Sequence, residues 1–173
     1  MTQLTYNEAF DPYHTAFRLL RLDSTCNFGE PVHFDLIRIL DFYLLFPFRL
    51  QSIRLFSADT EWRRISKAYL KLSPYGDLPE DVNLFSRMEH FQRAALTSLA
   101  NSGVISKTEW ERNEVKYLSS RVPEEMHQRF KELNKSMPDV VEILCAIKEK
   151  YPLLGRDGLK DRTGLLEYRY DAV

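Results

Sequence analysis

This sequence contains little glycine and little cysteine, and its positive and negative charges nearly balance. Six glycines and eight prolines in 173 residues exclude collagen-like and glycine-rich low-complexity chains. Lys and Arg number 24 against 25 Asp and Glu, so the formal net charge is −1. This balance excludes a strongly basic nucleic-acid binder as a bulk property, although a local basic face is still compatible with it.

Disulfide frameworks, signal peptides and membrane spans also lack support. Cys26 and Cys145 are too few for a disulfide framework, and the N-terminal MTQLTYNEAF has no apolar signal-peptide core. The most apolar stretch, residues 36–48, is too short for a bilayer and is interrupted by Arg38, Asp41 and Pro47. We therefore expect a soluble cytoplasmic protein, not associated with membranes, whose two cysteines are buried free thiols.

Catalytic motifs are absent as well. The four histidines are scattered without the i, i+4 pair of a zinc helix, and there is no nucleophile elbow, phosphate loop or dinucleotide fingerprint. Asp139, Glu142 and Lys150 partly match a nuclease motif. However, the apolar residues around them have the spacing of a helix, whereas that motif needs its residues on adjacent strands. We therefore expect no catalytic residues, no cofactor and no metal, and an enzyme assembled from distant residues is the least favoured alternative.

Apolar spacing predicts a mainly α-helical single domain with a small β-hairpin. Asp11 and Pro12 are typical of a helix start, and this helix should end near Asp23 with its arginines opposite the apolar face (Arg18 and Arg21). The segment 31–46 is apolar on nearly all sides, so we expect a buried core helix on which Arg38 and Asp41 pair.

The middle of the chain matches a winged-helix pattern. Helices are predicted from Thr60 and over 79–100, and the second of these should end at Gly103. Short strands at 104–105 and 115–118 would then flank a charged loop. The prediction is an N-terminal arm and helix (1–30), a winged-helix-like core (31–122), and C-terminal helices with a docking tail (123–173).

A winged helix raises the possibility of DNA contact. The basic residues that could contact DNA in such a fold are Arg87, Arg93, Lys107, Arg112 and Lys116. However, residues 107–121 hold four cations and three anions, a weak balance for neutralising phosphates. We favour a scaffold for protein contacts, with a DNA-binding transcriptional regulator as the alternative.

Two N-terminal motifs are familiar in combination. YNEAFDPYHTAFRLLRL (6–22) and RILDFYLLFP (38–47) resemble the middle-component family of bacterial ABC-three-component systems, which includes the small third subunit of Lamassu-type anti-phage defence systems. The resemblance implies a non-catalytic accessory subunit that bridges an SMC/Rad50-like ATPase and an effector, often a nuclease, and helps to hold or gate that effector. It also implies that DNA is reached only through the complex.

The matching residues are interpreted as determinants of the fold or of a partner interface. They are Tyr6, Phe10, Asp11, Pro12, Tyr13, Arg38, Asp41, Phe42 and Tyr43. Tyrosine is common at protein interfaces because it combines a large apolar ring with a polar tip. We expect changes at these positions to disturb assembly.

Overall fold

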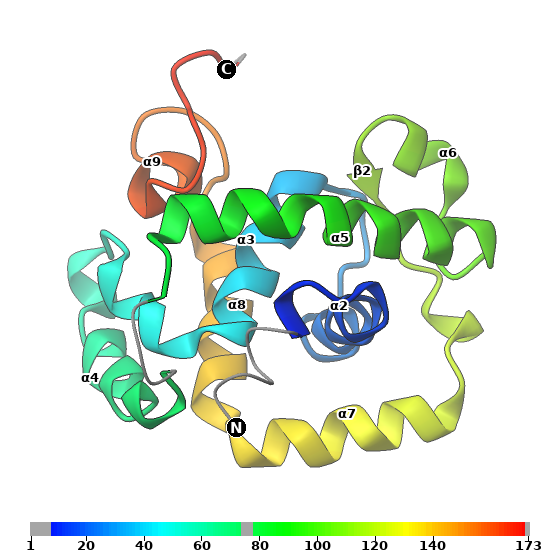
Figure 1. Cartoon of the computed structure of the whole chain (residues 1–173), viewed down its shortest axis with the longest axis horizontal. Coiled ribbons are helices and arrows are strands. Elements are labelled where there is room, and N and C mark those ends of the chain that lie inside the picture. The colour runs from blue at the N-terminus through cyan, green and yellow to red at the C-terminus, as the bar shows by residue number, and fades with distance from the viewer. Residues whose placement is uncertain (1–7, 74–77, 172–173) are drawn as a thin grey trace.

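The computed structural model describes residues 8–73 and 78–171. It is mainly α-helical with one small antiparallel sheet, as the sequence predicts. Helices α5 (Asp81–Asn101) and α7 (Glu124–Ser136) run across opposite sides of α2 (Pro12–Cys26), which Figure 1 shows nearly end-on. Helix α2 packs on both, and also on α3 (Phe34–Leu45) and α8 (Pro138–Lys150).

Helix α2 begins where its cap predicts. The Asp11 carboxylate accepts hydrogen bonds from the backbone N–H groups of Tyr13 (2.8 Å) and His14 (3.0 Å), and Pro12 occupies the first turn. These bonds lower the pKa of Asp11, with the His14 bond the largest cause. The helix continues beyond the expected end at Asp23 to Cys26, where Asn27 (φ 50°) takes a left-handed conformation.

Helix α3 is the buried centre of the molecule. It starts at Phe34, later than expected, because β1 (Val32–His33) pairs antiparallel with β2 (Glu114–Val115). The register joins Val32 to Val115 and His33 to Glu114. All but two residues of α3 are buried, in agreement with its all-round apolar sequence.

The observed strand pairing differs from the predicted β-hairpin. Ile105 and Tyr117 form an isolated antiparallel bridge, but the segment between them holds a short helix, α6 (Lys107–Glu111), where a loop was expected. The strand that pairs with β2 comes from Val32 and His33, far earlier in the chain. Local sequence cannot show such a long-range pairing, and the winged-helix comparison stays a prediction.

The remaining elements frame this core. Helix α5 is continuous. Gly103 follows its end and takes a positive φ (75°), as expected for a glycine after a helix C-terminus. The other elements are η1 (Pro47–Ser52), η2 (Ser57–Asp59), α4 (Trp62–Lys67), η3 (Leu70–Leu72), η4 (Ser119–Arg121) and α9 (Leu159–Thr163).

One hydrophobic core joins all three predicted regions of the chain. Leu19 of α2, Phe42 of α3 and Leu144 of α8 are each fully buried in it. The C-terminal tail packs back on the body, because the Lys160 ammonium lies 2.8 Å from the Asp171 carboxylate and 3.2 Å from that of Asp35. The tail is therefore ordered as a packed segment up to Asp171.

Tyr151 links α8 to the η2 turn through its hydroxyl. It donates a hydrogen bond to Asp59 (2.9 Å) and accepts one from the Phe56 N–H (2.9 Å), while its ring stacks on Phe56 at 4.2 Å. Burial is the main cause that raises the pKa of Tyr151 to about 12. The folded state therefore favours the neutral phenol.

We expect Tyr151→Phe to lower the free energy of unfolding at pH 7 by about 1–3 kcal/mol, because two polar groups lose their partner. Since the folded pKa exceeds the unfolded value near 10, the stabilisation is complete below pH 10 and is lost as pH rises toward 12. Urea unfolding curves at pH 7, 10 and 12 measure this difference. Tyr170→Phe, at a position that is 91% exposed, is the control, and equal curves for both variants would contradict the assignment.

Candidate interaction surface

The residues singled out by the N-terminal motifs divide into two groups. Phe42 and Tyr43 are fully buried in the core, and Asp11 and Pro12 form the start of α2. Tyr13, in contrast, is 86% exposed. Tyr13 is therefore the most exposed of the motif residues that the structure describes, whereas Asp11, Pro12, Phe42 and Tyr43 belong to the helix start and the core.

Phe10 and Tyr6 complete the motif set. The Phe10 ring packs against Phe91 of α5 with centroids 5.5 Å apart, and the Arg87 guanidinium lies 4.9 Å from its centre. Phe10 thus joins the N-terminal segment to α5. Tyr6 lies outside the described residues.

Arg18 and Asp41 form a buried ion pair between α2 and α3. Both Nε and Nη2 of Arg18 donate to the Asp41 carboxylate, at 2.7 and 3.2 Å. Gln92 of α5 donates a third hydrogen bond to the same carboxylate at 2.9 Å. Three helices therefore meet at one buried anion, whose charge and hydrogen-bonding capacity are both satisfied.

Arg38 does not pair with Asp41, contrary to the expectation from their spacing. Its guanidinium instead lies 3.4 Å from Asp35 and 3.3 Å from Glu89, and it stacks on the Phe85 ring at 4.2 Å. Burial lowers the pKa of Arg38, and the two carboxylates oppose that effect. The reason for the difference is that Asp41 faces α2, where Arg18 supplies a bidentate partner.

The residues proposed for DNA contact are spread over three places: Arg87 and Arg93 lie on α5, Lys107 and Arg112 lie at the two ends of α6, and Lys116 follows β2. Arg93 pairs with Glu89 at 3.0 Å and stacks on Phe34 at 4.4 Å. Lys107 and Arg112 are exposed on α6 and at its end. The hydrogen bond from Ser106 is the largest cause that lowers the pKa of Glu109, and the charges of Lys116 and Arg112 lower it further. Carboxylates thus offset part of this basic charge.

A groove lies between α2 and α7 and is closed at its base by α3. We call it the α2–α7 groove, and its volume is about 460 Å³. Three large apolar side chains on its walls are exposed to solvent, namely Tyr13 (86%), Leu133 (42%) and Leu72 (40%). The other lining residues are Glu8, His14, Phe17, Arg18, Arg21, Leu44, Leu45, Arg129 and Met137.

Sequence reasoning named Tyr13 as a determinant of the fold or of an interface, but it predicted neither the groove nor its other lining residues. Arg18 and Arg21 were expected on the polar side of α2, yet both are buried. Their position inside the apolar run AFRLLRL was the available signal, because a helix enclosed by α3, α5 and α7 has little face left for solvent. Leu133 and Leu72 come from distant segments, and only the fold brings them beside Tyr13.

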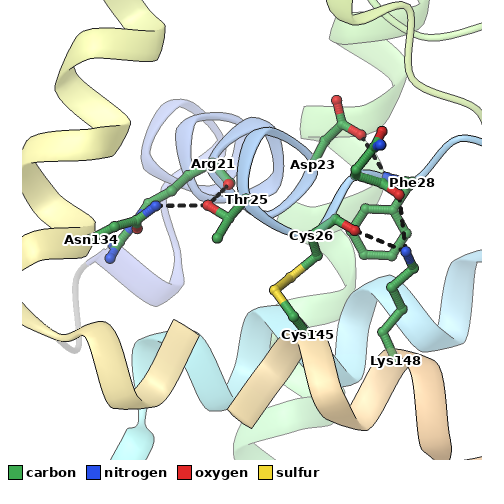
Figure 2. The surroundings of a disulfide bond; sticks show 9 residues. Arg21, Asp23, Thr25, Cys26, Phe28, Asn134, Cys145 and Lys148 are labelled. Atoms are coloured by element: carbon green, nitrogen blue, oxygen red, sulfur yellow. Dashed lines mark hydrogen bonds between the residues drawn. A yellow bond between two sulfur atoms is a disulfide. The ribbon is translucent and has the colours of Figure 1, made fainter. Parts of the chain in front are cut away.

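The two cysteines form a disulfide, which corrects the expectation of free thiols. Cys26, the last residue of α2, bonds to Cys145 of α8 across 119 positions, with Cα atoms 5.0 Å apart (Figure 2). Lys148, one turn along α8, donates hydrogen bonds to the carbonyls of Cys26 and Asn27, each at 2.9 Å. Spacing alone could not show this pairing, because the crossing of α2 and α8 creates it.

Among residues 8–73 and 78–171, no group of three or more His, Cys, Asp or Glu side chains is arranged to hold a metal ion. Within the same ranges, none of the helices combines the length and the apolar character needed to cross a lipid bilayer.

Comparison with known proteins gives a single assignment. No curated protein and no solved structure matches this chain. A family model described as ABC-three component (ABC-3C) system Middle Component 5 matches residues 4–171, which is nearly the whole chain and includes both N-terminal motifs. As a component of a multi-component system, such a chain has partner subunits. The chain therefore belongs to the Middle Component 5 family of ABC-three component systems.

Proposed function

We propose that this protein is a non-catalytic accessory subunit of a bacterial anti-phage defence complex of the Lamassu type. In this role it bridges an SMC/Rad50-like ATPase and a nuclease-type effector and helps to hold the effector until the ATPase is activated. DNA is reached through the complex. The observation that carries the proposal is the family match over residues 4–171.

Two features of the chain support a role in protein contacts. The α2–α7 groove presents large apolar side chains to solvent, and such exposed groups gather at protein-binding sites. The buried Arg18–Asp41 pair and its Gln92 partner hold α2, α3 and α5 in a defined arrangement beside that groove. A rigid scaffold with an exposed apolar site is suited to bridging other subunits.

Co-expression with the ATPase and effector subunits of the same system tests the proposal. We expect all three subunits to elute together from a size-exclusion column, and we expect the ATPase and effector to separate when this chain is omitted. ATP hydrolysis should be absent from the purified chain alone. The Tyr13→Ala variant should weaken the complex without lowering Tm, because the side chain is exposed. Elution of the chain apart from both subunits would refute the bridging role.

DNA binding by the isolated chain distinguishes the alternative. An accessory subunit that reaches DNA through the complex should bind a 30-base-pair duplex only in the non-specific range, at about 10⁻⁴–10⁻⁶ M. Fluorescence anisotropy with the purified chain measures this affinity. Nanomolar binding with a steep salt dependence, lost on Lys107→Glu and Arg112→Glu, would instead establish a DNA-binding regulator.

A further inference from the structure

Arg21 is a buried cation that has no carboxylate partner in the described part of the chain. It lines the α2–α7 groove and is only 8% exposed. Its Nε donates to the Asn134 side chain at 2.6 Å, but none of the residues that the structure describes forms a hydrogen bond with its buried Nη2. Among the described residues no Asp or Glu lies within ion-pair distance of Arg21, and burial lowers its pKa with no opposing charge.

Arg129 places a second cation on the opposite wall, on α7. Its guanidinium lies 5.3 Å from the centre of the Phe17 ring of α2, and it forms no ion pair with any carboxylate that the structure describes. Arg18 is neutralised by Asp41, and His14 lies 3.4 Å from Asp11. Glu8 is the one carboxylate among the described lining residues, so positive charge prevails in the groove.

We propose that the α2–α7 groove binds an acidic segment of a partner subunit, which places an Asp or Glu carboxylate against Arg21 and Arg129 and an apolar side chain against Tyr13 and Leu133. This inference rests on the proposed function, because it assumes a partner subunit. The carboxylate supplies the counter-charge that Arg21 lacks among residues 8–73 and 78–171. A buried charge without a counter-charge is costly. Pairing it with a carboxylate is favourable when the fold of the partner already holds that carboxylate in position.

The shape of the site favours a protein segment over a small anion. A volume of about 460 Å³ would suit either. However, a small anion would leave the apolar rim formed by Tyr13, Leu72 and Leu133 in water. A partner segment covers that rim, and tyrosine and arginine are the residue types that carry most binding energy at protein interfaces.

Matched pairs of substitutions test the site. Tyr13→Ala and Arg129→Glu change the groove, while Tyr170→Ala and Arg63→Glu change exposed residues of the same type elsewhere. Binding of each purified variant to the ATPase and to the effector is measured by biolayer interferometry. We expect the groove variants to raise Kd for one of these subunits by about 10-fold or more and the controls to change it by less than about 2-fold.

Arg21→Met separates binding from folding. Methionine keeps much of the side-chain length and removes the uncompensated charge, so Tm should stay within a few degrees of the wild type while the partner Kd rises about 10-fold or more. Raising the salt from 50 to 500 mM should weaken binding of the wild type more than binding of Arg129→Glu. Identical salt dependence for the two would overturn the proposed ion pair.

The outcomes separate this inference from the proposed function. If neither subunit binds the wild-type chain, the proposed function itself fails. If a subunit binds and the groove variants bind equally well, the function stands and the groove proposal is wrong. A dimer of the isolated chain that Tyr13→Ala dissociates would show that a second copy occupies the groove, and would also overturn the proposal.

Discussion

Asp41→Ala should lower the free energy of unfolding by about 3–5 kcal/mol, among the largest effects expected from a single substitution in this chain. The Asp41 carboxylate is fully buried and accepts hydrogen bonds from Arg18 and Gln92. Its removal leaves a buried guanidinium without its counter-charge and a buried amide without its acceptor. Urea denaturation followed by circular dichroism measures the loss, which corresponds to a fall in Tm of roughly 10 °C.

Two further variants show that the loss comes from the unpaired charge. Arg18→Met added to Asp41→Ala should recover part of the stability, because it removes the cation that was left without a partner. Glu61→Ala breaks the exposed Glu61–Arg64 pair and should cost less than about 1 kcal/mol. If the loss of unfolding free energy in the double variant equals the sum of the losses in Asp41→Ala and Arg18→Met alone, Arg18 and Asp41 are not energetically coupled.

Reduction of the Cys26–Cys145 disulfide should lower the free energy of unfolding by about 2–5 kcal/mol. The bond closes a loop with a sequence separation of 119, and a long closed loop restricts the unfolded chain strongly. Urea unfolding with and without dithiothreitol measures the effect. Because Lys148 also holds the carbonyls at the end of α2, we expect the reduced chain to remain folded, with an unchanged far-ultraviolet spectrum.

Cys145→Ser is the control for this prediction. Without dithiothreitol this variant should match the reduced wild type in stability, and dithiothreitol should have no effect on it. A thiol assay on the untreated wild type provides an independent measurement. Two reactive thiols in the unfolded but unreduced protein would mean that the disulfide does not form in solution.

The helix ends and the apolar pattern of α3 could be predicted from the sequence, because they depend on residues that are close together in the chain. Asp11 and Pro12 start α2, Gly103 ends α5, and the all-round apolar run of α3 is buried as expected. The two helix ends follow from contacts within a few residues of the chain, whereas α3 is buried because α2, α5 and α8 pack against its all-round apolar surface. The family resemblance, carried by motifs at 6–22 and 38–47, was likewise legible and agrees with the family match.

Partners separated along the chain were not readable, because periodicity indicates which face of a helix is apolar but not which element covers it. Arg38 and Asp41 have a spacing that fits a local pair, yet each finds a better partner on another helix. The strand pairing of Val32 with Val115 and the bond of Cys26 to Cys145 are likewise products of long-range packing.

The local sequence by itself determined the helical class, the start of α2 and the end of α5, since short-range hydrogen bonding and apolar periodicity specify helices. Its two N-terminal motifs also indicated the family. Only the tertiary structure decided which charges are paired in the core, that the cysteines meet, and that Tyr13 borders a groove containing Arg21 and Arg129. The physical reason is that burial depends on how α2, α3 and α7 cross. Their crossing sets the local dielectric environment and the neighbours of every charge.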